Sequence, residues 1–224
     1  MIYDVVVIGG GPAGATAAEE LACSNKKVAL IDKAGRIKPC GGAIPPCILS
    51  EFDIPRSLLK AEIQSARMIS PKAQKVDMPI EGTFVGMVDR DEFDPWLRLR
   101  AQRAGAELEL AAFKKVEYID KSTLRVTYVS KDYETETRTA TARCVLGADG
   151  ARSQVAKQGI PKYADVPWVL AYHEIVQAPE LATKDYDPER CEVWYQGGLS
   201  PDFYAWVFPH GKSASIGVGS AHKD

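Results

Sequence analysis

"IYDVVVIGGGPAGATAAEELACSNKKVALID", residues 2–32, contains a complete β-α-β pattern in one short stretch. Its first part, residues 2–10, is a β-branched apolar run that ends in glycine, which is typical of a strand buried on both faces. The segment that starts at Pro12 is rich in Ala and Glu and predicts a helix, because proline is tolerated in the first helical turn. Residues 26–32 predict a second buried strand. The handedness rule for such units then predicts two parallel strands with the helix across them.

The turn between the first strand and the helix carries a G-x-G-x-x-G motif. Gly9 permits a tight turn, Gly11 lets a pyrophosphate approach the backbone, and Gly14 lets the helix pack closely on the strand. The start of the helix offers backbone amides to the phosphates, and Asp32 follows the second strand, where it can accept hydrogen bonds from an adenosine ribose. The alternative is a glycine-rich turn without a ligand, but the order of strand, helix, strand and acid favours a dinucleotide. The motif alone does not distinguish FAD from NAD.

The composition is that of an ordinary soluble globular protein of 224 residues, with 46% hydrophobic and 26% charged residues and a formal net charge of -2. This length allows one large domain or two interleaved domains. No nucleic-acid partner is expected, because such proteins carry a basic excess or a basic face. The N-terminus lacks a basic segment with a cleavage site, and no apolar run approaches the ~20 residues of a membrane-spanning helix. We therefore expect a cytoplasmic protein whose membrane contact, if it has one, is peripheral.

Five cysteines and three histidines are the residues most often found in metal sites. The cysteines are widely spaced and lack a C-x-x-C pair, so neither a disulfide framework nor a metal site is expected. Cys23, Cys47 and Cys144 are expected to be buried thiols. His173 and His210 stand alone in the sequence and are expected to be surface histidines or histidines with satisfied hydrogen bonds.

Two further segments contain motifs that occur together in one group of flavoproteins. The stretch ARCVLGADGARSQVAKQ, residues 142–158, predicts a strand that leads into Asp149 and Gly150 and then into a short helix. Ser153 is a suitable cap for that helix. The stretch resembles the "DG" motif of the p-hydroxybenzoate-hydroxylase-like flavoproteins, which lies close to their cofactor. By this resemblance Asp149 and Gly150 are expected to contact FAD.

The second segment is MVDRDEFDPWLRLRAQRAGAELEL, residues 87–110. It predicts a helix that Arg90 opens, and it also resembles the same flavoproteins. The resemblance implies that Arg90 contacts the flavin side of FAD. The alternative is that Arg90 pairs with Asp91 or Asp94 at the start of the helix.

Several short sequence words narrow the family further. They are KPCGGAIP (38–45), EFDIP (51–55), MISP (68–71), GMVDR (86–90) and DFYAWVFP (202–209). Together they resemble the geranylgeranyl reductase family, most closely its (bacterio)chlorophyll-biosynthetic branch, and the resemblance covers essentially the whole chain.

The resemblance implies an α/β fold, in which a Rossmann-like FAD-binding domain is interleaved with an antiparallel-sheet substrate domain, as in the p-hydroxybenzoate-hydroxylase-like group. We expect segments 1–61 and 89–163 to form the FAD-binding domain. Segments 62–88 and 164–224 are expected to form the substrate domain. Flavoproteins of this group carry a further glycine-aspartate motif downstream, and the chain ends before it. The chain is therefore expected to be an N-terminal fragment.

The loop after the second strand is the expected flavin contact. In such reductases it runs beneath the isoalloxazine ring, and Gly41 and Gly42 allow the backbone to approach the ring closely. Cys40 is expected to act as a proton donor or a polar neighbour; the alternative is a small residue that fills space beside the flavin. The expected FAD contacts are Gly9, Gly11, Pro12, Ala13, Gly14, Asp32, Lys33, Cys40, Gly41, Gly42, Arg90, Val116, Asp149 and Gly150.

The last third of the chain predicts strands with many aromatic residues. These aromatic residues are Trp168, Tyr172, Trp194, Tyr195, Phe203, Tyr204, Trp206 and Phe208. One face of their sheet is expected to line a long apolar tunnel, and the alternative is an ordinary sheet core. By resemblance Tyr204, Trp206 and Phe208 are the expected substrate-binding residues, and Cys40 and Tyr204 are the candidate catalytic acids.

The activity implied by the resemblance is the FAD-dependent reduction of isolated double bonds in a geranylgeranyl chain, with NADPH as electron donor, to give phytyl. The chain would be carried as the diphosphate or on a (bacterio)chlorophyllide. Isolated alkenes are poor hydride acceptors, so the protein must supply alignment and a nearby acid. A long isoprenoid tail is compatible with peripheral attachment to a photosynthetic membrane. Two alternatives stay open: a flavin-dependent aromatic hydroxylase and a non-catalytic nucleotide-binding subunit.

Overall fold

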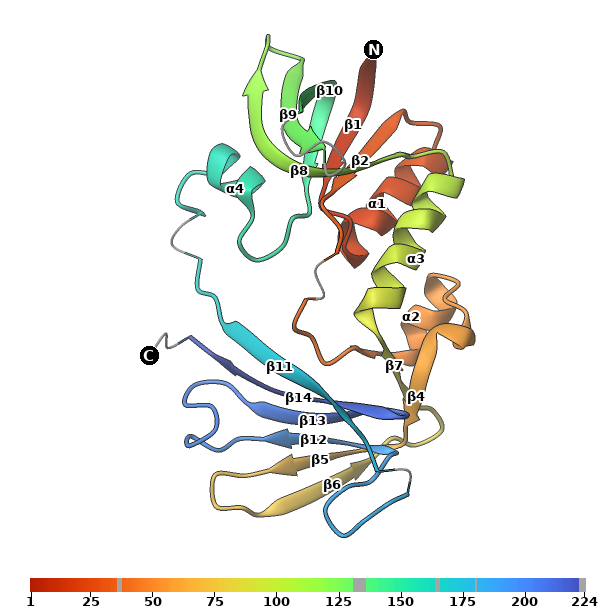
Figure 1. The fold of residues 1–224 in the computed structure, drawn as a ribbon, viewed down its shortest axis with the longest axis vertical. Coiled ribbons are helices and arrows are strands. Elements are labelled where there is room, and N and C mark those ends of the chain that lie inside the picture. Colours follow the sequence, from red (N-terminus) through yellow and green to blue (C-terminus); the bar gives the residue numbers. More distant parts are fainter. Residues whose placement is uncertain (36–37, 131–135, 164–165, 180, 222–224) are drawn as a thin grey trace. The chain divides into compact units, whose positions relative to one another are not determined.

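The computed structural model describes residues 1–35, 38–130, 136–163, 166–179 and 181–221 (Figure 1). Contacts between residues divide the chain into two compact units, each made of two stretches that are far apart in the sequence. Unit 1 comprises Met1–Arg36 and Asp94–Val166, and unit 2 comprises Ile37–Phe93 and Pro167–Asp224.

The boundaries of these units differ from those of the predicted domains. Segments 37–61 and 89–93, which were expected in the FAD-binding domain, belong to unit 2. The units are defined by contacts alone. The assignment of FAD binding and substrate binding to the predicted segments therefore stays a prediction.

Unit 1 is built around a closed ring of five strands in the order β1-β10-β9-β8-β2. Their bounds are Ile2–Ile8 for β1, Val28–Asp32 for β2, Glu107–Tyr118 for β8, Leu124–Ser130 for β9 and Thr137–Gly147 for β10. The strand β1 runs parallel to β2 and β10, β2 runs parallel to β8, and β9 is antiparallel to both of its neighbours. The pair of parallel strands predicted at 2–10 and 26–32 is confirmed, with observed bounds of Ile2–Ile8 and Val28–Asp32.

Apolar side chains fill both sides of the central strands of unit 1. On one side, Val6 and Ile8 pack in a buried cluster inside the ring, together with residues of β2, β8, β9 and β10. The alternate residues Val7 and Leu30 are also fully buried. The helix α1 (Pro12–Cys23) contacts β1 and β2 and buries small residues. Burial on both faces explains why the strands are continuous apolar runs and not alternating ones.

Unit 2 contains a six-stranded sheet in the order β11-β14-β13-β12-β5-β6. The bounds are Leu170–Gln177 for β11, Ser213–Ser220 for β14, Ala205–His210 for β13, Arg190–Trp194 for β12, Ser65–Ile69 for β5 and Lys75–Pro79 for β6. All neighbours are antiparallel except β12 and β5, which are parallel.

A second, three-stranded sheet of unit 2 has the order β3-β7-β4. Its strands are β3 (Ala43–Ile44), β7 (Val85–Val88) and β4 (Leu59–Ile63), and the short helices α2 (Pro46–Glu51) and η1 (Arg56–Leu58) lie between β3 and β4 in the sequence. Ile63, Met87 and Cys191 form a buried cluster against which Phe208 packs. The small sheet is therefore joined to β12 and β13 through an apolar core.

The two faces of the six-stranded sheet differ in character. Trp206 and Phe208 of β13 lie opposite Gly217 and Ser215 of β14, so these four residues share one face. We call it the loop face. Val207 lies opposite Glu192 and points to the other face, which we call the network face.

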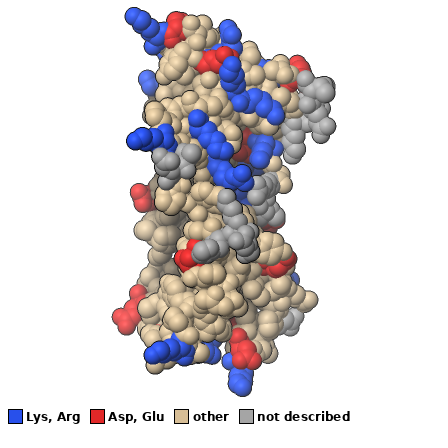
Figure 2. Space-filling model, turned by 90° about the vertical axis from the view of Figure 1, so that its left-hand side faces the viewer, with Lys and Arg blue, Asp and Glu red and all other residues tan. Residues whose placement is uncertain are grey.

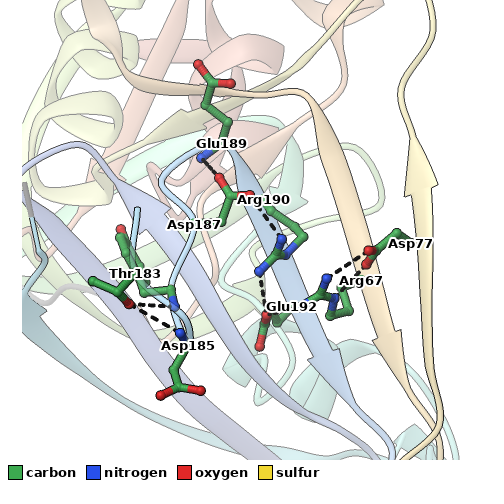
Figure 3. A network of polar contacts seen from close by, with 9 residues as sticks. Arg67, Asp77, Thr183, Asp185, Asp187, Glu189, Arg190 and Glu192 are labelled. Carbon is green, nitrogen blue, oxygen red and sulfur yellow. Dashed lines mark hydrogen bonds and ion pairs between the residues drawn. The ribbon is translucent and has the colours of Figure 1, made fainter. Parts of the chain in front are cut away.

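Ion pairs cover part of the network face (Figure 3). Arg67 lies 2.6 Å from Asp77 and 3.6 Å from Glu192, and Arg190 lies 3.2 Å from Glu192 and 3.0 Å from Asp187. Glu192 is buried. A buried carboxylate costs free energy unless it is paired, and two guanidinium groups provide that pairing here.

Charged side chains of both signs are scattered over the face of the molecule in Figure 2, with wide uncharged areas between them. Among the helices that the structure describes, none is long and apolar enough to cross a lipid bilayer.

The predicted burial of Cys23, Cys47 and Cys144 is wrong, because all three are exposed. Cys23 is the last residue of α1, and Cys47 lies in the first turn of the short helix α2. Cys144 lies opposite Val5 of β1, so its side chain points away from the buried cluster inside the ring, which Val6 and Val145 join. Cys191 is the buried cysteine.

Candidate functional site

The glycine turn between β1 and α1 leaves open space where a ligand can bind. Gly9 has φ +102°, and a Cβ there would overlap the carbonyl oxygen of Ala148. A Cβ at Gly14 would overlap the carbonyl oxygen of Gly9. At Gly11, in contrast, no heavy atom of the described part of the chain lies within 4 Å of the Cβ position. The protein's own packing thus requires Gly9 and Gly14, whereas only a bound group would require Gly11.

Asp32 is bound to the same turn. Its carboxylate accepts hydrogen bonds from the backbone N of Gly10 and the backbone N of Ala34, both at 2.7 Å. A carboxylate has further lone pairs, and Asp32 is only partly buried. Its predicted hydrogen bonds to a ribose are therefore compatible with the geometry and stay a prediction.

The sequence analysis missed Arg98, which completes this arrangement. Arg98 belongs to α3 (Arg90–Arg103), is buried, and donates from Nη1 to the carbonyl oxygen of Gly10 at 3.1 Å. The same nitrogen lies 3.5 Å from Asp32 Oδ1. Asp32 and Arg98 therefore hold the peptide groups on both sides of Gly10. In the sequence, the spacing of Arg98 from Asp94 and Ala101 places the three residues on one face of the predicted helix. The structure shows that this face is buried.

In the predicted "DG" segment, Asp149 and Gly150 lie between the end of β10 and the start of the helix α4 (Gln154–Gly159). Asp149 accepts hydrogen bonds from the Ser153 hydroxyl and from the backbone N of Gln154, the latter at 2.6 Å. Ser153 Oγ accepts from the backbone N of Ala156 at 2.9 Å, which confirms the predicted cap. Asp149 thus stabilises a helix start, and its contact with FAD, like that of Gly150, stays a prediction.

The other predicted FAD contacts in unit 1 do not all lie at the glycine turn. Pro12, Ala13 and Lys33 are exposed. The backbone N of Val116 donates to Gln158 of α4 at 3.0 Å, and Val116 lines a cavity of about 340 Å³ formed by β8, β9, β10 and α4. None of residues 9–14 lines this cavity, so the structure does not bring Val116 together with the glycine turn.

In unit 2, residues 38–42 form the CGG loop, which packs on the loop face. A Cβ at Gly41 would overlap the ring of Phe208, and a Cβ at Gly42 would overlap the carbonyl oxygen of Val88. Gly42 has φ +75°, and its carbonyl oxygen accepts from the backbone N of Val88 at 2.9 Å. Both glycines are needed for this close packing.

The two predicted acids lie near each other in unit 2. Burial raises the pKa of the Tyr204 hydroxyl above its usual value, and Tyr195 and Cys40 raise it further through their charges. Tyr204 stacks on Phe203 with 4.2 Å between ring centroids, and its centroid lies 6.1 Å from that of Trp206. Tyr204 is therefore protonated at neutral pH, and it lies against the rings of Phe203 and Trp206.

The aromatic residues do not all share one face. The register places Tyr172 and Trp194 on the network face, whereas Trp206 and Phe208 lie on the loop face. Trp206 is buried, and a Cβ at Gly217 would overlap its ring. The glycine opposite Trp206 thus makes room for the indole, which belongs partly to the sheet core.

A cavity of about 90 Å³ lies beside the CGG loop. Its lining residues are Cys40, Val88, Asp89, Arg90, Asp91, His173, Ile175 and His210. The structure therefore brings Cys40 and Arg90 together at one cavity, and their contact with FAD stays a prediction. Arg90 is the first residue of α3, which confirms the predicted helix start.

The two histidines that stand alone in the sequence share this cavity. His173 Nδ1 lies 3.1 Å from Ser215 Oγ, which accepts a hydrogen bond from Trp206 Nε1 at 3.1 Å. Burial lowers the pKa of His173 below its usual value, and the charge of His210 lowers it further. A neutral His173 can accept the Ser215 hydroxyl hydrogen. His210 is also hydrogen-bonded, so both histidines are satisfied, as predicted.

The fold and these residues define an α/β dinucleotide-binding protein. The ligand space at Gly11, the start of α1 without a side-chain cap and the acid at Asp32 fit the pyrophosphate and ribose of a dinucleotide. The chain belongs to the pyridine nucleotide-disulphide oxidoreductase family, whose model matches residues 3–191. Membership of this family supports FAD as the cofactor, and NADPH is the usual nicotinamide cofactor of the family.

Comparison with curated proteins supports the resemblance found in the sequence. The chain is 54% identical to the geranylgeranyl diphosphate reductase of Rhodobacter capsulatus over 225 aligned residues, which cover 100% of this chain and 56% of that protein. It is 39% identical to the chloroplastic geranylgeranyl diphosphate reductase of Oryza sativa, covering 98% of this chain and 49% of that protein. The chain thus spans about half the length of these relatives.

Solved structures agree with the predicted fold class. A geranylgeranyl bacteriochlorophyll reductase-like protein from Thermoplasma acidophilum matches with a TM-score of 0.78 and 28% identity, covering 98% of this chain and 57% of that one. A flavin-dependent brominase matches with a TM-score of 0.77 and 18% identity, covering 98% and 56%. The second match shows the fold alone. Together with the first match it confirms the predicted fold class, an α/β fold like that of p-hydroxybenzoate-hydroxylase-like flavoproteins.

Proposed function

We propose that the protein reduces isolated double bonds of a geranylgeranyl chain, with NADPH as electron donor and FAD as cofactor. The observation that carries the proposal is the packing of the CGG loop on the loop face, with Gly41 against Phe208 and with Cys40 close enough for its charge to raise the pKa of Tyr204. The 54% identity to a geranylgeranyl diphosphate reductase supports it.

Each unit by itself contains some of the predicted FAD contacts. In unit 1, the turn at Gly11 offers backbone amides to the pyrophosphate, and Asp32 offers a carboxylate to the ribose. In unit 2, Gly41 and Gly42 offer a flat backbone surface without side chains, suited to the isoalloxazine ring. When bound, FAD supplies the hydride chemistry that side chains lack. The remaining predicted contacts, including Arg90, Val116, Asp149 and Gly150, belong to the same proposal.

The chain's own part in the reaction is to hold the alkene and to deliver a proton. A hydride and a proton must both add to the double bond, so an acid is needed on the protein side. Tyr204 keeps its hydrogen at neutral pH because its pKa is raised, and Cys40 carries a thiol nearby. Trp206 and Phe208 are the proposed isoprenoid contacts; Phe208 is partly exposed, whereas Trp206 is buried. Cys40 and Tyr204 are therefore the candidate proton donors.

The substrate is proposed to be geranylgeranyl diphosphate or a geranylgeranylated (bacterio)chlorophyllide. We further propose a cytoplasmic protein that attaches peripherally to a photosynthetic membrane, where such apolar substrates dissolve.

The test is an anaerobic incubation of the full-length protein with NADPH and each substrate, followed by mass spectrometry. Stepwise gain of hydrogen pairs is the expected result. An added oxygen, seen only when air is admitted, would indicate a flavin hydroxylase instead, and a flavin-bound protein that changes neither substrate would contradict the proposal.

A further inference from the structure

His210 contacts the CGG loop from β13, although it lies far from the loop in the sequence. Its Nε2 lies 2.9 Å from the carbonyl oxygen of Gly41, and its Nδ1 lies 2.7 Å from Asp89 Oδ1. The side chain of His210 is 4% exposed, so water does not compete strongly for these partners. The imidazole therefore bridges a strand end, a carboxylate and the loop.

We propose that His210, oriented by Asp89, is a positioning residue that fixes the Gly41 peptide and so sets the height of the CGG loop against the flavin ring. This inference rests on the proposed function, because that function places FAD on the loop. It concerns neither the proposed proton donors, Cys40 and Tyr204, nor the proposed isoprenoid contacts, Trp206 and Phe208.

The chemistry of the ring favours this role. Both ring nitrogens face oxygen acceptors, and both hydrogen bonds form together when both nitrogens carry a hydrogen. The bond to Asp89 is then charge-assisted, which makes it strong and directional. Asp89 directly precedes α3. Its backbone carbonyl oxygen accepts hydrogen bonds from the backbone N of Glu92 and the backbone N of Phe93, at the start of that helix. The carboxylate that orients the ring is thus itself attached to a well-defined helix start.

Packing around the ring leaves the loop little freedom. A Cβ at Gly42 would lie 2.7 Å from His210 Cε1, so the ring rests directly against the loop backbone. The next peptide along the loop is also restrained, because the backbone N of Val88 donates to the carbonyl oxygen of Gly42 at 2.9 Å. Phe208 lies against Gly41. Among these contacts, only the hydrogen bond from His210 is made to the Gly41 carbonyl oxygen. Removing this hydrogen bond therefore frees the Gly41 peptide to rotate.

The decisive variants are His210→Leu and Asp89→Asn, made in the full-length protein. His210→Leu removes both donors, and Asp89→Asn removes the charge that orients the ring while keeping nearly the same shape. The matched control is Asp91→Asn, because Asp91 lines the same cavity and loses the same charge two residues away. Thermal unfolding of each variant reports whether it still folds.

Four readouts are compared with those of the wild type: the FAD dissociation constant, the visible circular dichroism of the bound flavin, kcat and KM. Each decisive variant should bind FAD about tenfold more weakly, as expected for a lost charge-assisted hydrogen bond. The flavin spectrum should change and kcat should fall, with KM for the isoprenoid nearly constant. The double variant should be no worse than His210→Leu, because Asp89 acts through His210.

Several outcomes would overturn the inference. One is a folded Asp89→Asn variant with the FAD affinity and flavin spectrum of the wild type. Another is an Asp91→Asn variant that shows the same losses. A third is a double variant in which the losses of FAD affinity of His210→Leu and Asp89→Asn add up fully. This result would show that His210 and Asp89 act separately.

Failure of the proposed function is distinguishable from failure of this inference. If the wild type bound no flavin or reduced no isoprenoid, NMR of the wild type without flavin would still test the contact. Slowly exchanging ring N–H signals that disappear in His210→Leu, with one lost in Asp89→Asn, are expected. If these N–H signals were absent, the hydrogen bonds from His210 to Asp89 and Gly41 would be contradicted.

Discussion

Arg98 and Asp32, which lie far apart in the sequence, form an ion pair over the glycine turn of unit 1, with 3.5 Å between Nη1 and Oδ1. Because Arg98 also donates to the carbonyl oxygen of Gly10, this pair restrains the backbone that would meet the pyrophosphate. The residue that shapes the nucleotide site is therefore a buried arginine outside the motif.

Replacing Arg98 by methionine should weaken FAD binding about tenfold to hundredfold, because the Gly10 peptide loses its partner and Asp32 loses its counter-charge. Titration of the full-length apoprotein with FAD, followed by flavin fluorescence, measures this. The matched control is Arg100→Met, since Arg100 lies on the same helix and pairs with Glu19 at 2.6 Å. Equal losses of affinity in the two variants would show that the turn is not specifically affected.

Alanine at Gly11 and alanine at Gly14 should have opposite consequences. Gly11→Ala places a Cβ in open space, so thermal unfolding should be nearly unchanged while FAD affinity falls sharply. Gly14→Ala forces a Cβ onto the Gly9 carbonyl and should destabilise the fold by roughly 3 kcal/mol or more. A Gly11→Ala variant that binds FAD like the wild type would mean that the open space is not used by the cofactor.

Tyr204→Phe and Cys40→Ala should separate flavin reduction from alkene reduction. Neither residue is expected to take part in hydride transfer from NADPH, so stopped-flow bleaching of the flavin should keep its rate. Oxidation of the reduced flavin by the isoprenoid should slow by about 10²- to 10⁴-fold in whichever variant lacks the proton donor. Tyr195→Phe is the control, because it removes the hydroxyl of an exposed neighbour. If both variants keep the wild-type rate, neither residue supplies the proton.

The buried thiol of Cys191 predicts a loss of stability in alkali. Burial raises its pKa from 9.0 to about 12. Below pH 9 the thiol is protonated in both states and does not change the free energy of unfolding. Between pH 9 and pH 12 the unfolded thiol ionises while the folded one stays protonated, so the free energy of unfolding should fall by up to about 1.4 kcal/mol per pH unit.

Urea unfolding between pH 7 and about pH 10.5 measures this slope. Cys191→Ala should make the dependence on pH shallower, apart from a constant loss that reflects the small cavity it leaves. Cys23→Ala, which removes an exposed thiol, should keep the wild-type slope. A Cys191→Ala variant with an unchanged slope would show that other groups cause the alkaline loss.

Some features could be predicted because they depend on neighbours in the chain. The β-α-β unit, the cap at Ser153 and the helix start at Arg90 all follow from backbone sterics, capping and apolar periodicity within short windows. The exposure of Cys23, Cys47 and Cys144 could not be predicted in this way. Exposure depends on which strand or helix covers a residue, and residue type carries only a weak preference for it.

The sequence by itself therefore determined the dinucleotide turn, since glycines at fixed spacing after a buried strand leave few other backbone conformations. Only the tertiary structure decided which side chains serve it. Arg98 reaches Gly10 across 88 positions, and His210 reaches Gly41 across 169 positions. Such contacts depend on strand order and register, and a shift of one residue in β13 would turn His210 and Phe208 to the network face. No local pattern encodes that register, because it is set by the packing of all the strands together.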